Sequence, residues 1–480
     1  MELDKDLLAQ QEARNLTKLA KTAQAQLAKM SQQQLDKITE VIAQRFSQAA
    51  EELAQMAVEE TGFGNVKDKT EKNRFASLRV LEAIKPMKTV GVLNTFPEEK
   101  LWQIGVPIGV IAAIVPSTNP TSTVCYKALI ALKSGNSIVF SPHPKALRCT
   151  LKAAQIVAEA AAQAGAPAGS ISCLSIPSMA GCKELMSAKE VNLILATGGP
   201  AMVKAAYSAG KPAIGVGAGN GPAYIHRTAD VEHAMQCILQ SKTFDNGTVC
   251  ASEQSIIVEK DMEHIVKKTA AGLGFYFMTT EEAGALSKLL FRPTGGINPE
   301  IVGKSALELA QKAGFSVPST VKVLVAREQE AGPTRPYSME KLCPVLAFFV
   351  MDSEDAVLEK AIEVLTHEGS GHTFVIHAKD EAVVRKFALQ IPVSRFLVNT
   401  PAALGGIGAT TGLFPALTLG CGAVGGSSSS NNISPMDLIN IRRVAWDQKP
   451  MPCSCQKQEQ ACIDPQLVEL LTAKILERLK

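Results

Sequence analysis

Hydrophobic and polar positions along the chain form alternating blocks that predict helices and short strands. Over residues 3–60, apolar side chains recur every three or four positions among Gln, Lys, Glu and Ala, without a proline, which predicts helices. Residues 102–144 then combine an apolar β-rich run, a loop with two prolines, an Ala/Leu/Lys helix and a short strand at 137–140. This strand–helix–strand order is the repeating unit of a parallel sheet.

The alternation continues beyond this unit and is best explained by a doubly wound α/β domain. From Asp230 the pattern starts again, with a helix over 230–242, a loop around Cys250 and the strand SIIVE at 255–259, which predicts a second α/β domain. Within the first domain, helices are expected at 148–164, 180–187 and from Ala201, and strands at 171–176, 191–196 and 212–216.

The pattern changes twice near the carboxyl end. GGSSSSNNISP (425–435) is short and precedes the strand-like LINIRRVAW, so it is interpreted as a loop. Residues 448–464 have no hydrophobic period and are typical of a linker. An amphipathic helix is predicted over 465–480, with Asp464 as its N-cap and Pro465 at its first position.

Composition limits the class of protein. The 480 residues, 46% hydrophobic and 20% charged, suit two or three globular domains with large cores. A net charge of +3 without a long basic run argues against a nucleic-acid partner. The longest apolar stretch, 104–115, contains glycine and proline and is too short to span a membrane. The polar start and the 11 cysteines, which lack a disulfide-like spacing, indicate a cytosolic protein whose thiols are mostly free.

One cysteine lies in a setting that suits chemistry. In TFDNGTVCASEQS (243–255), Cys250 follows a glycine-containing polar stretch that lets the backbone approach a substrate closely. An ionised, positioned thiol is a nucleophile, whereas most cysteines are buried structural thiols. No second Cys or His has metal-ligand spacing to it, so a metal site is not indicated. These residues alone leave the nucleophile and the structural thiol open.

Seven further stretches accompany the Cys250 motif FDNGTVCASEQS (244–255): VPSTNPTS (115–122), SPHP (141–144), ATGGPAMV (196–203), GVGAGNGPAYI (215–225), EKLCPVLAFF (340–349), GSGHT (369–373) and LGCGAVGGSSSSNNISP (419–435). In this chain order they resemble the aldehyde dehydrogenase superfamily, most closely its coenzyme-A-acylating branch of acetaldehyde and propionaldehyde dehydrogenases. The resemblance covers residues 10–446 and implies that Cys250 is the nucleophile.

The resemblance implies attack of the Cys250 thiolate on an aldehyde carbonyl, hydride loss to a nicotinamide, and a thioester on the cysteine. The passing oxyanion needs donors, which would be the Cys250 backbone N–H and a polar side chain. Hydrolytic relatives use an asparagine in a Pro-x-Asn-x-Pro loop. In PSTNP, aligned by its prolines, Thr118 takes that position rather than Asn119. Both residues are therefore candidates, although Asn119 could equally cap a turn.

The fate of the thioester follows from a missing carboxylate. Hydrolytic relatives activate water with the glutamate of Glu-Leu-Gly-Gly-Lys-x-Pro, and alignment through Pro222 places Val216 at that position. Valine cannot act as a general base, so coenzyme A is expected to take the acyl group in a reversible thioester exchange. The alternative is that another carboxylate, such as Glu253, replaces the missing one.

Residues that would hold NAD and coenzyme A follow from the same resemblance. Gly198 and Gly199 would meet the pyrophosphate before a helix N-terminus, although such a pair also forms ordinary turns. Glu340 matches the glutamate that holds the nicotinamide ribose, with a surface charge as the alternative. Coenzyme A would enter the same groove after NADH leaves, and His372 in GSGHT would contact substrate or coenzyme A, or be a structural histidine.

The adenine end of the cofactor would be shaped by Ser141, Pro142 and His143. Many relatives have a lysine at the adenosine ribose, where this chain has Ser141. Loss of that lysine leaves NAD and NADP both open, and NAD is favoured.

The implied fold is that of aldehyde dehydrogenases, with a Rossmann-like NAD-binding domain, an α/β catalytic domain and a small oligomerisation strand region. LINIRRVAW resembles the family's oligomerisation strand, so a homodimer or homotetramer is expected. The expected boundaries are 1–229 for the NAD-binding domain, 230–420 for the catalytic domain, 421–447 for the return loop and oligomerisation strand, 448–464 for the linker, and 465–480 for the terminal helix.

The linker and terminal helix together resemble the encapsulation peptides of bacterial microcompartment enzymes. The apolar face of the helix has no core of its own and is expected to bind a shell or cargo protein, or to pack back on the enzyme or its oligomer. The expected location is a microcompartment lumen within the cytoplasm. Cys453, Cys455 and Cys462 in the linker have no histidine nearby and are interpreted as incidental.

The leading hypothesis is a NAD-dependent, coenzyme-A-acylating dehydrogenase of a short aldehyde. Acetaldehyde is the favoured substrate, with propionaldehyde and sulfoacetaldehyde as alternatives. A hydrolytic aldehyde dehydrogenase is the second hypothesis, and a non-catalytic scaffold that organises cargo through the tail is the third. The intact Cys250, Glu340 and glycine motifs argue against the scaffold.

Overall fold

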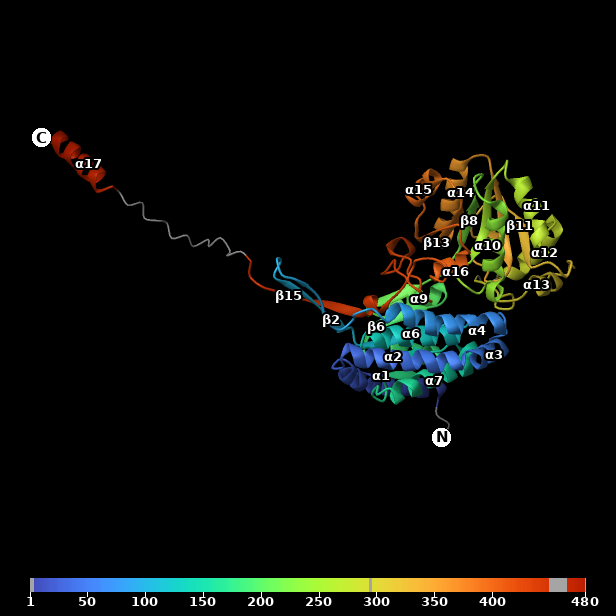
Figure 1. Ribbon diagram of the computed structural model, residues 1–480, viewed down its shortest axis with the longest axis horizontal. Coiled ribbons are helices and arrows are strands. Elements are labelled where there is room, and N and C mark those ends of the chain that lie inside the picture. Colours follow the sequence, from blue (N-terminus) through green and yellow to red (C-terminus); the bar gives the residue numbers. More distant parts are fainter. Residues whose placement is uncertain (1–3, 293–295, 449–463, 480) are drawn as a thin grey trace. The chain divides into compact units, whose positions relative to one another are not determined.

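The protein has two compact units in a computed structural model (Figure 1). The first unit contains two parallel sheets with helices on both faces, and the second contains a small three-stranded sheet and the C-terminal helix. The structure describes residues 4–292, 296–448 and 464–479. The first unit comprises Met1–Gly91 and Gly105–Asn440, and the second comprises Val92–Ile104 and Ile441–Lys480.

The first sheet is formed by five parallel strands: β3 (Val110–Ile114), β4 (Ser137–Ser141), β5 (Ile171–Cys173), β6 (Val191–Thr197) and β7 (Ala213–Val216). Their order is β5-β4-β3-β6-β7, so the chain continues to one side of β3 and later to the other. Ligands of such Rossmann-like sheets bind beyond the carboxyl ends of the strands at this switch point. The predicted doubly wound α/β fold is confirmed.

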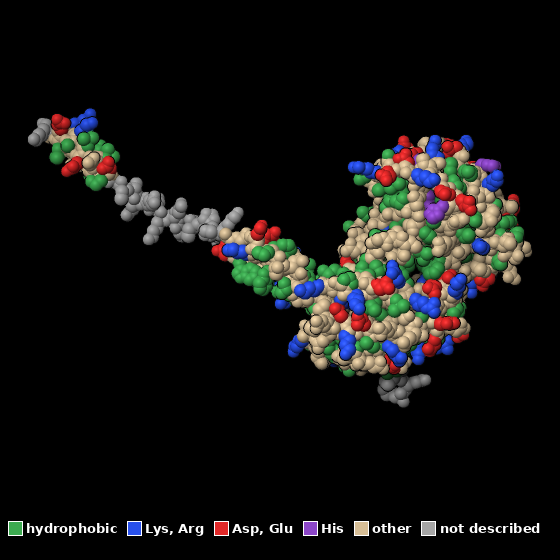
Figure 2. Space-filling model, viewed as in Figure 1, with side chains coloured by type: hydrophobic (Ala, Val, Ile, Leu, Met, Phe, Trp, Pro, Cys, Tyr) green, Lys and Arg blue, Asp and Glu red, His purple; other side chains and the backbone are tan. Residues whose placement is uncertain are grey.

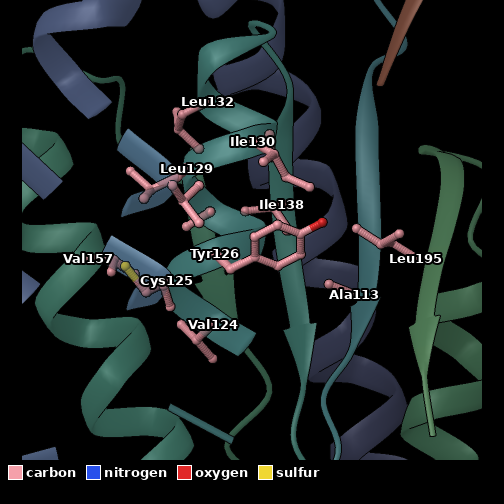
Figure 3. Packing of buried hydrophobic residues seen from close by; sticks show 14 of the residues in the cluster. Ala113, Val124, Cys125, Tyr126, Leu129, Ile130, Leu132, Ile138, Val157 and Leu195 are labelled. Carbon is pink, nitrogen blue, oxygen red and sulfur yellow. The ribbon is translucent and has the colours of Figure 1, made fainter. Parts of the chain in front are cut away.

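Helices cover both faces of this sheet: α1 (Lys5–Leu27), α2 (Gln32–Gln48), α3 (Ala50–Thr61), α4 (Val66–Arg74), α5 (Val80–Ile84), α6 (Pro120–Lys133), α7 (Leu147–Gln163), α8 (Met179–Ser187) and α9 (Pro200–Tyr207). Ile111 and Ala113 of β3 pack with α2, α6 and α7, whereas Val110 and Ala112 pack with α1 and α8. Figure 3 shows the first of these layers, centred on α6, whose residues are all buried.

The second sheet is formed by seven parallel strands: β8 (Gly221–Ile225), β9 (Glu253–Glu259), β10 (Phe275–Phe277), β11 (Val323–Arg327), β12 (Val345–Met351), β13 (Gly371–His377) and β14 (Val393–Val398). Their order is β10-β11-β12-β9-β8-β13-β14. The change of sheet therefore lies between Val216 and Gly221, one strand before the boundary expected at residue 229. Because β7 and β8 are both short, apolar and buried, the local pattern does not separate them.

Helices also cover both faces of the second sheet. One face packs against α10 (Val231–Thr243) and α11 (Glu263–Leu273). The other packs against α12 (Thr280–Leu290), α13 (Ala306–Lys312), α14 (Glu354–His367) and α15 (Glu381–Ala388). The remaining short elements are α16 (Ala402–Gly406), the π-helical turn η1 (Phe75–Arg79), and the 3₁₀ turns η2 (Pro144–Ala146), η3 (Phe244–Gly247), η4 (Pro336–Ser338), η5 (Ala423–Gly425) and η6 (Pro435–Leu438).

Two expected strands differ from the pattern. The apolar run over 102–115 splits at Gly109 into β2 (Leu101–Pro107), which joins a separate three-stranded sheet, and β3. The strand expected over 171–176 ends at Cys173, because the backbone N–H groups of Ser175 and Ile176 donate to the Glu12 carboxylate at 2.9 and 3.1 Å.

The second unit contains most of the sheet β1-β2-β15, with β1 (Gly91–Phe96) and β15 (Ile439–Ala445). The rings of Trp102 and Trp446 meet edge to face, with centroids 4.9 Å apart. The strand predicted for LINIRRVAW is therefore present. Among the described residues, no helix has the length and apolar character needed to cross a membrane.

The C-terminal helix α17 (Pro465–Arg478) begins as predicted, with Asp464 accepting from the Gln466 N–H at 3.0 Å. None of its described residues is buried, and Figure 2 shows its hydrophobic side chains exposed among charged ones. Most of the predicted linker, with its three cysteines, lies outside the described residues. The exposed apolar residues include Leu467, Leu470, Leu471, Ile475 and Leu476.

Candidate active site

A cavity of about 950 Å³ lies beyond the carboxyl ends of the first sheet's strands and reaches the loops of the second sheet. Its wall contains the loop after β3 (116–119), the turn after β6 (198–200) and the end of β7 with its following loop (216–218). From the second domain come residues 248–250, before β9, and 339–340, before β12. This position is the switch point at which doubly wound sheets bind ligands.

Cys250 lies in the wall of this cavity, half-buried, after a tight turn. Asp245 and Asn246 both have left-handed backbone, with φ of 50° and 51°, and Gly247 follows with φ of 75°. Non-glycine residues keep such conformations only where their surroundings hold them. Gly219 lies against this loop, and a Cβ there would come 1.9 Å from the Cys250 carbonyl oxygen, so only glycine allows the approach.

The charge state of Cys250 is set by its surroundings. Burial raises the pKa of the thiol to about 12, and the nearby Glu340 carboxylate adds to the rise, whereas Arg395 opposes it. Without ligands, Cys250 is therefore a neutral thiol at neutral pH. Ionisation must accompany substrate binding or a change in the neighbouring charges.

The alkylation rate of Cys250 by iodoacetamide is expected to rise about tenfold per pH unit between about pH 7 and pH 10, because only the thiolate reacts. The pKa of the folded protein lies above this interval, so the thiolate fraction keeps increasing with pH across it. Mass spectrometry of the peptide that contains Cys250 measures the rate. A plateau already reached near neutral pH would contradict the raised pKa.

Both candidate oxyanion donors line the cavity. Asn119 holds the Thr118 hydroxyl and the loop of Cys250 together, since its Nδ2 donates to Thr118 Oγ1 at 3.3 Å and to the Thr248 carbonyl at 3.2 Å. Asn119 precedes α6 but makes no side-chain cap to it. The alternative role of a turn cap is thus not what this asparagine does in the structure.

Two carboxylates line the cavity near the nucleophile loop. Glu340 Oε1 accepts from the Gly219 N–H at 2.9 Å, and Glu368 Oε2 accepts from the Glu340 N–H at 2.7 Å. Burial, with Glu368 adding, raises the pKa of the Glu340 carboxyl to about 8. Glu340 is therefore a half-buried residue of the cavity wall rather than a surface charge.

Val216, which the alignment puts at the position of the hydrolytic glutamate, lines the cavity at the end of β7. Glu253, the candidate replacement for the missing glutamate, is absent from the cavity wall. It is fully buried and accepts from the Ala402 N–H at 2.8 Å, and burial raises its pKa to about 7. Glu253 therefore belongs to the packing of α16 against β9 and not to the site.

The residues expected for NAD and coenzyme A separate into two groups. Gly198, Gly199 and His143 line the cavity, together with Glu340. Ser141 and Pro142 do not, because Ser141 is the buried last residue of β4 and the chain reaches the cavity only at His143.

His372 also lies outside the cavity wall, directly behind Gly219. A Cβ on Gly219 would be 3.0 Å from His372 Cε1, so the imidazole ring lies against the loop of Gly219. The N–H of the same glycine donates to Glu340. The Nδ1 atom is 2.9 Å from Thr373 Oγ1, and Nε2 is buried without a hydrogen-bond partner. Burial lowers the pKa of His372 well below its ordinary range, with Arg395 adding, so the ring is neutral.

The cavity residues that sequence reasoning missed include Lys72 and Glu368, and it also missed the buried pair that Lys72 forms with Asp245. Lysines on polar helices are usually exposed, so nothing in the local pattern of α4 marks Lys72 as buried. Asp245 belongs to the Cys250 motif, and a charged residue in that motif is the one signal in the sequence that a buried partner such as Lys72 is needed.

Comparison with known proteins shows the family of this chain. The aldehyde dehydrogenase family model matches residues 6–274. The bifunctional aldehyde-alcohol dehydrogenase of Escherichia coli K12 is 47% identical over 82% of this chain and 45% of its own length, so the chain spans about half of that relative. The chain belongs to the aldehyde dehydrogenase family.

Solved structures of aldehyde dehydrogenases are also similar to this chain over most of its length. A probable aldehyde dehydrogenase from Listeria monocytogenes EGD-e is 54% identical with a TM-score of 0.92, covering 94% of this chain and 99% of its own. An acetylating aldehyde dehydrogenase from Geobacillus thermoglucosidasius is 49% identical with the same TM-score, covering 94% and 100%. A propionaldehyde dehydrogenase from the fucose utilisation microcompartment of Clostridium phytofermentans is 30% identical with a TM-score of 0.82, covering 91% and 97%.

Proposed function

We propose that the protein oxidises a short aldehyde with NAD and transfers the acyl group to coenzyme A, through a thioester on Cys250. The observation that carries this proposal is that Cys250 and Val216 line the same cavity. The cysteine supplies a nucleophile, and the valine leaves no general base at the position where hydrolytic relatives have one. Acylating relatives support the same reaction.

The residues of the first sheet are proposed to hold the dinucleotide. A Cβ on Gly199 or on Gly217 would meet nothing within 4 Å, so both glycines leave open space at the start of α9 and after β7. A helix N-terminus suits a pyrophosphate. Glu340 is proposed to hold the nicotinamide ribose and His143 the adenine end. When bound, NAD accepts the hydride of the aldehyde carbon.

The acyl step is carried by Cys250. The Cys250 thiol loses its proton to solvent, its sulfur bonds to the aldehyde carbon, and the oxygen becomes an oxyanion that takes hydrogen bonds from the Cys250 N–H and a side chain of the Thr118–Asn119 pair. After hydride loss the carbon is a thioester. The thiolate of coenzyme A attacks it, the new carbon–sulfur bond forms, and Cys250 leaves as a thiolate. The predicted contact of His372 with substrate or coenzyme A is kept as a proposal: its Nε2 lies behind Gly219, so the contact requires that loop to move aside.

NADH formation from acetaldehyde and NAD, followed by absorbance with and without coenzyme A, tests this proposal. Turnover that requires coenzyme A, with acetyl-CoA as product, is the expected result. Steady NADH formation without coenzyme A would contradict it and would favour the hydrolytic hypothesis. Propionaldehyde and sulfoacetaldehyde are compared at the same enzyme concentration, and a higher kcat/KM for either would replace acetaldehyde as substrate. NADP in place of NAD tests the cofactor preference.

The exposed helix α17 supports a second proposal, that the tail binds a shell or cargo protein of a bacterial microcompartment. A relative of known structure comes from such a compartment. We further propose a homodimer or homotetramer formed through β15, whose Ile441 is exposed. We also propose that the first sheet with its helices is the NAD-binding domain, and that the second sheet with its helices is the catalytic domain.

Replacing Leu471 and Ile475 of α17 by glutamate is expected to abolish co-sedimentation with assembled shells and to leave kcat unchanged. The reason is that both side chains belong to an apolar face, and none of the described residues of α17 is buried. Replacing the exposed Lys474 by glutamate is the matched control, since it changes charge without removing apolar surface. Equal loss in both variants would contradict an apolar docking face.

A further inference from the structure

A pair of buried lysines lies beneath the loop of Thr118. Helix α4 places Lys69 and Lys72 three residues apart, and both ammonium groups contact Asp245 Oδ2, at 2.9 and 2.5 Å. The three side chains are 4%, 3% and 0% exposed. Buried charges of this kind are retained only when they are paired and hydrogen-bonded.

Every donor of Lys72 is in use. An ammonium group has three N–H bonds, and those of Lys72 reach Asp245 Oδ2, Asn119 Oδ1 at 2.6 Å and Thr248 Oγ1 at 3.0 Å. Lys72 lines the cavity but has no donor left for a substrate. Lys69 acts in parallel, because its Nζ also donates to the Thr118 carbonyl at 2.8 Å. The two lysines thus join the loop after β3 to the loop before Cys250.

The lysine determines which way the Asn119 amide points. A lysine ammonium only donates, so the atom of Asn119 that faces Lys72 must be the oxygen. The amide nitrogen then faces the Thr248 carbonyl and Thr118 Oγ1, at 3.2 and 3.3 Å, and both of its hydrogens are used. Thr118 Oγ1 accepts one of them, which leaves the hydroxyl proton of Thr118 free.

We propose that Thr118 is the side-chain donor to the oxyanion, and that Lys72 is a positioning residue that orients it through Asn119. The chain of contacts runs from Asp245 through Lys72 and Asn119 to the Thr118 hydroxyl, and each link has only one possible direction of donation. Thr118 and Cys250 both line the cavity. This inference rests on the acylating reaction proposed above.

The charges of the cluster agree with a fixed, donor-only lysine. Burial works against ionisation of Asp245, but Lys69 and Lys72 outweigh it and hold its pKa below the ordinary value. Burial lowers the pKa of Lys72 to about 8, and Asp245 opposes the change. At neutral pH the lysine is therefore protonated, as the contacts require.

A double-mutant cycle tests the proposal. Thr118→Val, which removes the hydroxyl at nearly constant volume, is expected to lower kcat by about 10²–10³-fold, and Thr118→Ser to retain most of it. Lys72→Met is expected to lower kcat by about 10²-fold. If Lys72 acts through Thr118, the double variant is no more than about threefold below Thr118→Val, because the losses are not additive. Full additivity would overturn the proposal, as would a fully active Thr118→Val.

The alkylation rate of Cys250 by iodoacetamide distinguishes a loss of Thr118 orientation from a displacement of the loop that holds Cys250. The alkylation forms no carbonyl oxyanion, so its rate in Lys72→Met and Thr118→Val is expected to equal that of the wild type. A changed rate together with lost turnover would show that the cysteine itself had moved, and would contradict the proposed role. Absence of acyl-CoA formation in the wild type, with normal alkylation of Cys250, would show that the proposed function itself fails, whereas normal acyl-CoA formation in both the wild type and Thr118→Val would overturn this inference alone.

Asn119→Asp provides an independent variant should Lys72→Met not fold. A carboxylate accepts from Lys72 as the amide oxygen does, but it also draws the Thr118 hydroxyl proton towards itself. The expected result is a fall in kcat of about 10²-fold. Wild-type kcat in Asn119→Asp would overturn the assignment of Thr118 as the donor.

Discussion

Cys250→Ser is expected to lower the rate of NADH formation by about 10³-fold or more, whatever the aldehyde. A serine hydroxyl fits the space of the thiol but ionises far less readily and is a weaker nucleophile. The surroundings of residue 250 disfavour an anion there, because burial, with Glu340 adding, raises the pKa of the native thiol more than Arg395 lowers it. The cavity, its glycines and the oxyanion donors remain, so binding of NAD is expected to be unchanged.

The matched control is Cys173→Ser, in the short strand β5, far along the chain from the nucleophile motif. Cys173 is half-buried like Cys250, and its Sγ donates a hydrogen bond to the Leu174 carbonyl. This variant is expected to keep wild-type turnover and thermal stability within measurement. Mass spectrometry of wild-type enzyme with aldehyde and NAD, without coenzyme A, is expected to find the acyl adduct on the Cys250 peptide. Wild-type activity in Cys250→Ser would exclude the covalent mechanism.

Val216→Glu is expected to raise the rate of NADH formation in the absence of coenzyme A by about 10²-fold, with the free acid as product. The valine lines the cavity at the end of β7, so a carboxylate there would lie in the same wall as Cys250. Val216 is only 2% exposed, and burial raises the pKa of a carboxyl group. The added glutamate acts as a base only above that raised pKa, so the gain is expected to grow as pH rises.

Val216→Gln is the control, because it has the size and polarity of the glutamate without a basic group. It is expected to show the low, coenzyme-A-dependent activity of a perturbed enzyme and no increase in acid formation. Product analysis by chromatography separates free acid from acyl-CoA in each variant. If Val216→Glu and Val216→Gln give the same ratio of products, the residue at this position does not decide between water and coenzyme A.

Much of the fold could be predicted because the signals are local. The alternation of apolar strands and helices in the first sheet is a repeated pattern of short period, and the Cys250 motif lies within a dozen residues. The N-cap Asp464 and Pro465 likewise fixed the start of α17 from adjacent positions. The position of Glu340 in the cavity wall and the exclusion of Glu253 from it could not be predicted in this way, since both are carboxylates beside apolar strands.

The sequence by itself was enough to predict the kind of chemistry, because the candidate nucleophile, the valine at the position of the hydrolytic base and the glycine turns are residue types in short motifs. Tertiary structure decided which sheet each strand joins, and it placed Glu253, Ser141 and His372 outside the cavity wall. It also brought Lys69 to Asp245 across 176 positions of the chain. The physical reason is that a side chain's solvent exposure and hydrogen-bond partners depend on segments distant in sequence, which no local pattern contains.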